Sequence, residues 1–178
     1  MKLLFCDNSL KELVNFRGDV IENFLDKGYE IVLVAPDNQG DFRFRDRVKL
    51  YTPAVSRSGM NPIKDMRYLI TLLKIYNRER PNIVFHYTIK PNIYGSLACR
   101  LNSIKSVAMI TGLGYAFNHN DIRSRVARAL YRFAMRFPER IMVLNESNQQ
   151  VLVDSHIILP HKTVLLKGGE GRNLDHYK

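Results

Sequence analysis

The sequence lacks the features that mark several common classes of protein. No stretch of its 178 residues approaches the roughly 20 apolar residues of a membrane-spanning helix. The apolar part of segment 1–10 is too short for a secretory signal and has no small-residue cleavage site, so we expect a first strand there. Cysteine is scarce, and Cys6 and Cys99 have no metal-like spacing. We expect both to be buried thiols in a reducing cytoplasm.

Several ligand-binding motifs are also missing. Segment 7–19, which we expect to be a long polar loop after the first strand, has no G-x-G-x-x-G pattern. NAD or FAD binding in the ordinary mode is therefore not expected. The sequence also has no P-loop, nucleophile elbow, zinc spacing or nucleic-acid-binding fingerprint. We expect no cofactor and no metal in this chain, and no nucleic acid as its partner.

What the sequence does contain is typical of a folded, basic domain. Hydrophobic residues make up 46% of the chain, and 27 Lys and Arg against 17 Asp and Glu give a net charge of +10. The length suffices for one well-packed domain or for half of a two-domain enzyme. The charge favours nucleic acid, anionic lipid or phosphorylated substrates without choosing among them.

Short apolar runs alternate with helical patterns along the whole chain. This alternation predicts βαβ units and a Rossmann-like, doubly wound, mainly parallel sheet in an α/β domain of three layers. Asn61 and Pro62 predict a capped helix start, and Gly28 predicts a helix end. The apolar face of the helix that starts at Pro62 is expected at Ile63, Met66, Leu69, Ile70, Leu73 and Tyr76. The expected strands are 2–6, 29–36, 48–53, 82–87, 106–110, 140–144 and 163–166, and the expected helices are 16–28, 62–80, 92–101, 122–137 and 146–154.

Four segments follow strands at the carboxyl edge, where open α/β sheets bind ligands. In chain order they are 7–19, 56–62, 87–96 and 110–121. Each also has a purely structural interpretation, as a cap, a turn or a packed loop. A cation near the start of a helix favours binding of an anion. Glycines let the backbone approach a ligand closely. Aromatic rings can stack on the ring of a sugar. The candidates outside the third segment are Asn15, Arg17, Arg57, Gly112, Gly114 and Tyr115.

The third segment, "YTIKPNIYGS" (87–96), carries the densest set of polar side chains. Thr88 and Lys90 precede Pro91, so they are expected at the positive end of a helix, where a phosphate, a carboxylate or sugar hydroxyls would bind. Tyr87 and Tyr94 are expected to stack on a sugar ring. His86 is a candidate base, although a single histidine at a strand end is more often structural.

One basic pattern lies away from this edge. Arginines recur every three or four residues in segment 122–137, which predicts a basic stripe along a helix. Such a stripe is usually a solvated helix face, but the segment has no acidic residue, which favours an anionic surface. The residues of this predicted membrane-surface stripe are Arg125, Arg128, Arg132 and Arg136.

Taken in order, four stretches resemble the N-terminal half of family 4 glycosyltransferases. They are "NFRGDVIENFLDKGYEIVLVAP", "SRSGMNPIKDMRYLITLL", "RPNIVFHYTIKPNIYGSLACRL" and "ITGLGYAF". Within the family, the sequence is most similar to bacterial enzymes that build capsule, O-antigen and exopolysaccharide. The tail "LLKGGEGRNLDHY" resembles the crossing between the family's two domains.

The resemblance implies the N-terminal half of a GT-B fold. Residues 1–166 would form the acceptor-binding domain of a retaining, hexosyltransferase-type enzyme, and residues 167–178 would begin a linker to a C-terminal donor domain. That second domain, in cis or in trans, would bind a UDP- or GDP-linked sugar, and this chain would be inactive alone. The implied acceptor is a lipid-linked glycan, and the implied location is the cytoplasm, at the inner face of the membrane.

Two departures from the family pattern concern the site. Many members have two glycines in the first loop, where this chain reads "SLKELVNFRG", and many have a histidine facing the donor sugar, a place that His86 or Tyr87 would take here. By the resemblance, Thr88, Lys90 and Tyr94 would hold the acceptor or the leaving phosphate. The alternatives are a subunit of a split transferase and a non-catalytic module that binds anions or nucleic acid.

Overall fold

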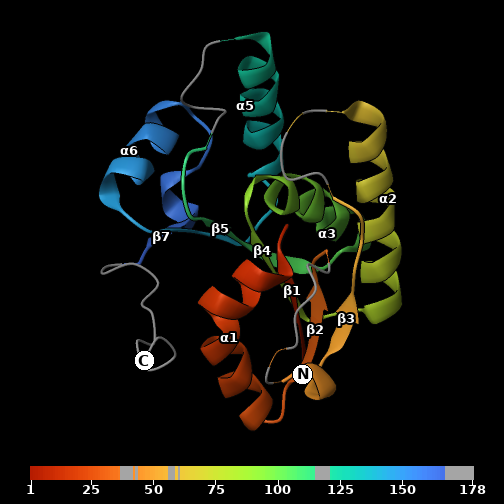
Figure 1. Cartoon of the computed structure of the whole chain (residues 1–178). Helices are drawn as coiled ribbons and strands as arrows, with labels where there is room; N and C mark the ends of the chain where they lie inside the picture. The colour runs from red at the N-terminus through yellow and green to blue at the C-terminus, as the bar shows by residue number, and fades with distance from the viewer. Residues whose placement is uncertain (37–41, 43, 56–58, 60, 115–120, 167–178) are drawn as a thin grey trace.

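The computed structural model contains one seven-stranded sheet in which every pairing is parallel (Figure 1). The structure describes residues 1–36, 42, 44–55, 59, 61–114 and 121–166. The strand order is β3-β2-β1-β4-β5-β6-β7. The doubly wound parallel sheet expected from the sequence is thus confirmed. The strands are β1 (Lys2–Cys6), β2 (Glu30–Val34), β3 (Lys49–Tyr51), β4 (Ile83–Tyr87), β5 (Lys105–Ile110), β6 (Arg140–Val143) and β7 (Thr163–Leu165).

Helices cover both faces of the sheet and give three layers. Leu3 and Phe5 of β1 pack beneath α1 (Leu10–Asp26), whereas Leu4 and Cys6 pack beneath α2 (Pro62–Glu79) and α3 (Ser96–Asn102). On that second face, β5 and β6 pack against α5 (Ile122–Ala134) and α6 (Glu146–Asp154). The π-helical turn η2 (Pro91–Gly95) leads into α3, and two short 3-10 helices are η1 (Arg45–Arg47) and η3 (Pro160–Lys162). No helix among the described residues is both long and apolar enough to span a bilayer.

Helix α1 begins earlier than expected. Ser9 is its N-cap and accepts a hydrogen bond from the amide of Glu12 at 3.2 Å. Segment 7–19 is therefore not a long polar loop, because its last ten residues belong to the helix. The serine-x-x-glutamate spacing is a capping box, and this pattern favours helix initiation at that point. The expected end is confirmed, since Gly28 adopts a φ of +79° just beyond the C-cap Lys27.

Helix α2 begins as expected, but only part of its expected apolar face is buried. Asn61 caps it and accepts from the amide of Lys64 at 3.0 Å, with Pro62 at the first helical position. Tyr76 is buried as expected, and Leu69 and Leu73 pack against the core while partly exposed. The other expected core residues, Ile63, Met66 and Ile70, are exposed. The buried side includes two carboxylates, each paired with lysine: Asp65 with Lys90, and Glu79 with two lysines from β1 and β3. Its buried residues are Asp65, Tyr68, Leu72, Ile75, Tyr76 and Glu79.

Candidate functional site

The strand order places a topological switch point between β1 and β4. The chain runs from β1 outward to β3 on one side, then crosses back to β4 and continues to β7 on the other. In open α/β sheets, the crevice beyond the carboxyl ends of two such strands is the usual ligand site. The residues that follow β1 and β4 are Asp7 and Thr88. Both therefore lie at the position where a ligand is expected.

Arg17 and Tyr87 meet at this edge of the sheet. Arg17 lies on α1, and its guanidinium carbon is 4.6 Å from the centroid of the Tyr87 ring. The same guanidinium donates to the Met109 sulfur at 3.1 Å and to the Phe16 carbonyl at 3.1 Å. Arg17 is only 6% exposed. A cation this buried fixes the tyrosine ring in place and brings positive charge to the end of β4.

Asp7 is a site residue that the sequence interpretation missed. It is 5% exposed, and one of its carboxylate oxygens accepts from the Asn8 amide at 2.6 Å. Burial raises the pKa of its carboxyl to about 7, even though that hydrogen bond and the nearby Arg17 act in the opposite direction. The available signal was a single polar residue directly after the first strand. At neutral pH this carboxyl is poised between its acid and base forms.

Thr88 has an unusual backbone conformation. Its φ is +67°, a left-handed value that a β-branched residue rarely adopts, and its hydroxyl donates to the Tyr87 carbonyl at 2.5 Å. Such a strained conformation persists only where the surrounding structure enforces it. Residues of this kind cluster at ligand sites. The Thr88 carbonyl in turn accepts from the Asn92 amide in η2.

Lys90 and Tyr94 converge on the carboxylate of Asp65 in α2, which the sequence interpretation did not name. The Lys90 ammonium is 2.6 Å from a carboxylate oxygen of Asp65, and both side chains are largely buried. Tyr94 is half-buried, and burial together with the neighbouring Asp65 raises the pKa of its phenol. Lys90 therefore shares its charge with Asp65, and any anion at this edge would meet a paired lysine.

The other expected residues are distributed unevenly. Asn15 is exposed and lies two residues from Arg17 on α1, about 200° around the helix, so the two do not meet.

Gly112 and Gly114 follow β5 at the same edge as Thr88, and Gly114 has a φ of +61°. A Cβ at Gly114 would lie 2.9 Å from Ile89 in the loop after β4. Arg57 and Tyr115 lie outside the described residues, as does the predicted linker 167–178.

His86 lies within the core and not in the crevice. It is fully buried beneath α2, and its Nε2 is 3.0 Å from the Tyr76 hydroxyl. Burial lowers its pKa to about 3, so the ring is neutral at physiological pH. The turn η2 packs directly on it, since a Cβ at Gly95 would lie 2.3 Å from the ring. This geometry fits the structural interpretation of His86, whose ring is enclosed between Tyr76 of α2 and Gly95 of η2.

The predicted arginine stripe runs along one side of α5 and continues past its end. Arg125 and Arg136 are exposed, whereas Arg128 is half-buried. Arg132 donates to the Ser155 carbonyl at 2.6 Å. One arginine of the stripe therefore binds α5 to the segment that follows α6, and is not only a solvated charge.

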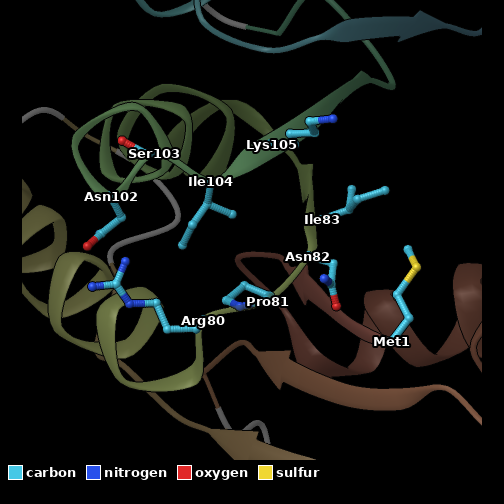
Figure 2. A pocket seen from close by; sticks show the side chains of 9 residues that line it. All are labelled: Met1, Arg80, Pro81, Asn82, Ile83, Asn102, Ser103, Ile104 and Lys105. Atoms are coloured by element: carbon cyan, nitrogen blue, oxygen red, sulfur yellow. The ribbon is translucent and has the colours of Figure 1, made fainter.

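A pocket of about 500 Å³ lies at the opposite edge of the sheet (Figure 2). Its lining comes from the amino ends of β1, β4 and β5 and from the carboxyl ends of α2 and α3. Helix carboxyl ends carry partial negative charge, which disfavours an anionic ligand. None of the expected site residues lines this pocket, whose lining is Met1, Arg80, Pro81, Asn82, Ile83, Asn102, Ser103, Ile104 and Lys105. Among the described residues, no group of His, Cys, Asp and Glu side chains is arranged to hold a metal ion.

Comparison with known sequences decides the family. A model of the family described as glycosyl transferase 4-like matches residues 3–145. The chain belongs to this glycosyl transferase 4-like family. It is 28% identical to UDP-Gal:alpha-D-GlcNAc-diphosphoundecaprenol alpha-1,3-galactosyltransferase of Escherichia coli over 121 aligned residues. The aligned region covers 67% of this chain and 31% of the relative.

Solved structures share the fold of this glycosyl transferase 4-like chain at low sequence identity. Acinetobacter baumannii MurG has a TM-score of 0.64 at 13% identity, covering 97% of this chain and 46% of MurG. UDP-GlcNAc 2-epimerase from Methanocaldococcus jannaschii has a TM-score of 0.66 at 15% identity, covering 93% of this chain and 45% of the epimerase. Anabaena Alr3699/HepE, solved with UDP-glucose, has a TM-score of 0.64 at 15% identity, covering 99% and 46%. The chain thus spans less than half the length of each of these relatives.

Proposed function

We propose that this chain is the acceptor-side, N-terminal domain of a retaining GT-B glycosyltransferase of the hexosyltransferase type. A C-terminal domain, in cis or in trans, would bind a UDP- or GDP-linked sugar, and the chain would be inactive without it. One observation carries the proposal. In a glycosyl transferase 4-like chain, the β1–β4 switch point gathers a buried cation, an aromatic ring and a strained threonine, namely Arg17, Tyr87 and Thr88.

The chemistry of sugar transfer fits these side chains. The bond between the anomeric carbon and the donor phosphate would break, a bond to the acceptor oxygen would form, and the acceptor hydroxyl would pass its proton to the departing phosphate oxygen. The leaving diphosphate gains negative charge, which a preorganised cation stabilises. We assign this role to Lys90, whose ammonium is held at the crevice by Asp65. Thr88 and Tyr94 would contact the acceptor, while Gly112 and Gly114 would let the backbone approach it.

We further propose a lipid-linked glycan as the acceptor, at the inner face of the bacterial membrane. Two observations support it. The Escherichia coli relative is named for an acceptor carried on diphosphoundecaprenol. The net charge of +10 favours an acceptor that carries diphosphate and lies against anionic lipid. The pathway would be synthesis of capsule, O-antigen or exopolysaccharide.

The ion pair between Lys90 and Asp65 allows a sharp kinetic test in the two-domain enzyme. Removing Lys90 alone would leave a buried carboxylate uncompensated, so loss of activity would not separate catalysis from folding. We therefore compare the parent, which keeps both charges, with D65N/K90Q, which removes both together. If Lys90 stabilises the leaving phosphate, D65N/K90Q lowers kcat/KM at least tenfold below the parent. Equal kcat/KM in the parent and the double variant would remove Lys90 from the proposed chemistry.

Whether the donor domain comes in cis or in trans is decided by the gene. An in-frame continuation beyond codon 178 that encodes a donor domain would establish one polypeptide. A stop codon followed by a separate gene for a donor domain would establish a split transferase. In either case, recombining this chain with that domain should restore sugar transfer that neither part performs alone, and transfer by this chain alone would contradict the proposal.

A further inference from the structure

Helix α5 exposes a continuous apolar stripe. Its buried side includes Ser124, Tyr131 and Ala134, which face the sheet. Four large apolar residues lie on the opposite side at spacings of four, four and three, and are between 36% and 78% exposed. This is the reverse of an ordinary surface helix, whose outer side is polar. The four residues are Ile122, Val126, Leu130 and Phe133.

Helix α2 has a second stripe of the same kind. Ile63, Met66 and Ile70 lie on one side of its first three turns and are exposed, at 67%, 55% and 44%. We call these three residues and the four of α5 the α2–α5 surface. Both helices cover the same face of the sheet (Figure 1). Because the stripe residues are exposed, both stripes lie on the side of their helix away from the sheet. The two helices also begin at the same edge, the one that carries the candidate site, because each follows the carboxyl end of a strand.

The charges around the α2–α5 surface have one sign. The two carboxylates of α2 that pack against the sheet are buried and paired with lysines, and α5 has no acidic residue. Exposed charges on these two helices are therefore all basic: Lys64, Arg67, Lys74 and Arg78 on α2, and Arg123, Arg125 and Arg132 on α5. Helix α1, on the other face of the sheet, exposes Lys11, Glu12, Asp19 and Asp26. The domain thus has a basic, apolar side and a mixed side.

We propose that the α2–α5 surface lies flat on an anionic lipid bilayer, with its apolar side chains below the headgroups and its basic side chains at the level of the phosphates. This pattern of apolar ridge and basic flanks is what an interfacial helix presents to a membrane. The inference names a surface and an orientation for the domain. It rests on the proposed function in one respect: a lipid-linked acceptor would bring the domain to a membrane.

Two other occupants fit the surface less well. A second copy of the chain in a two-fold dimer would bring identical basic surfaces together, which costs electrostatic repulsion. Nucleic acid would satisfy the cations but would leave the apolar stripes in water, since its backbone contacts are polar. A bilayer with anionic headgroups satisfies both.

The chain has no tryptophan, so a single introduced tryptophan reports on one position. Val126 on α5 and Val20 on α1 are 44% and 47% exposed and lie on opposite faces of the sheet. We would titrate V126W and V20W with phosphatidylcholine vesicles that either contain or lack phosphatidylglycerol. Only V126W should shift its emission to shorter wavelength, and only with phosphatidylglycerol. Equal shifts in both variants, or no shift in either, would overturn the inference.

Two further variants separate the apolar and basic contributions. I63Q/F133Q should weaken vesicle partitioning about tenfold or more, because two large apolar side chains no longer leave water. R123Q/R125Q should weaken it about five-fold per arginine and flatten its dependence on salt. The matched control K11Q/K27Q, with one lysine in α1 and one at its C-cap, should partition like the parent chain. Binding lost equally in that control would show non-specific attraction and refute the surface.

The alternative occupants give their own signals. Sedimentation of the parent chain as a dimer that I63Q/F133Q makes monomeric would assign the surface to self-association. Tighter binding to duplex RNA than to vesicles, unaffected by I63Q/F133Q, would assign it to nucleic acid. Either result overturns the inference. Failure of the proposed function is distinguishable, because the two-domain enzyme can be assayed with a short-chain, water-soluble acceptor that needs no bilayer.

Discussion

Two buried titratable groups give the domain opposite and separable responses to acid. His86 has its pKa lowered to about 3, so only the unfolded state takes up a proton as pH falls below the ordinary value of 6.5. Stability from this group is therefore lost as pH falls from 6.5 towards 3. Asp7 has its pKa raised to about 7 from an ordinary value of 3.8, so the folded state takes up its proton first. Stability from Asp7 is therefore gained as pH falls from 7 towards 3.8.

The magnitude follows from about 1.4 kcal/mol per pH unit for each proton. Between pH 6.5 and 4.5, His86 should cost roughly 3 kcal/mol, and Asp7 should return a similar amount. The parent chain should therefore show little net change from these two groups in this window. D7N removes the opposing contribution, so its free energy of unfolding should fall by roughly 3 kcal/mol relative to the parent over the same two pH units.

Urea unfolding at half-unit pH intervals, followed by circular dichroism, measures this difference directly. Comparison with the parent at each pH cancels the other titrating groups. An exposed carboxyl variant, E139Q, serves as the control and should track the parent. A D7N curve parallel to that of the parent between pH 6.5 and 4.5 would refute the reasoning about Asp7.

Three further predictions concern stability and use the same urea assay. S9A should cost about 1 kcal/mol, because it removes the N-cap of α1; no loss would mean that the cap contributes nothing. G95A should lower the free energy of unfolding by about 1–3 kcal/mol, because its Cβ would lie 2.3 Å from the buried imidazole ring of His86. The control G112A should be neutral, because no atom of the described residues beyond its chain neighbours lies within 4 Å of the position of its Cβ. Equal effects of the two variants would contradict the packing. K90A should cost about 3–5 kcal/mol by leaving Asp65 buried and unpaired, and D65N/K90Q should recover most of it; a double variant as unstable as K90A would contradict the pairing.

The strands and the order of elements were predictable from the sequence because the signals are local. Runs such as 29–36 are apolar throughout, as a strand covered on both faces must be. The start of α1 was equally local, but its capping signal at Ser9 and Glu12 lay inside a segment interpreted as a polar loop. Polarity alone does not distinguish a loop from the first turns of a helix whose outer side is solvated.

The buried face of α2 was not predictable in the same way. Hydrophobic spacing favoured Ile63 and Met66 as core residues, whereas the sheet covers the side that carries Asp65 and Glu79. Those carboxylates are buried because lysines from distant strands reach them, and such pairs depend on the tertiary fold. The exposed apolar stripe of α2 went unrecognised for the same reason.

The candidate site was predictable in outline only. The carboxyl edge follows from the fold class, and Arg17, Tyr87 and Thr88 do meet at it. The burial of His86 and the pairing of Lys90 required knowledge of which elements pack above β4. Asp7 went unnoticed because one carboxylate after a strand has no motif around it.

The central claim is that this chain holds the acceptor at the β1–β4 edge while another domain holds the donor. Amide chemical shifts of the 178-residue chain, titrated with a short-chain, diphosphate-linked sugar acceptor and separately with a UDP-sugar, test it most directly. We expect the acceptor to shift the amides of Asp7, Thr88 and Gly112, and the UDP-sugar to shift them little. Acceptor-induced shifts confined to Arg80 and Lys105, at the opposite edge, would contradict the account.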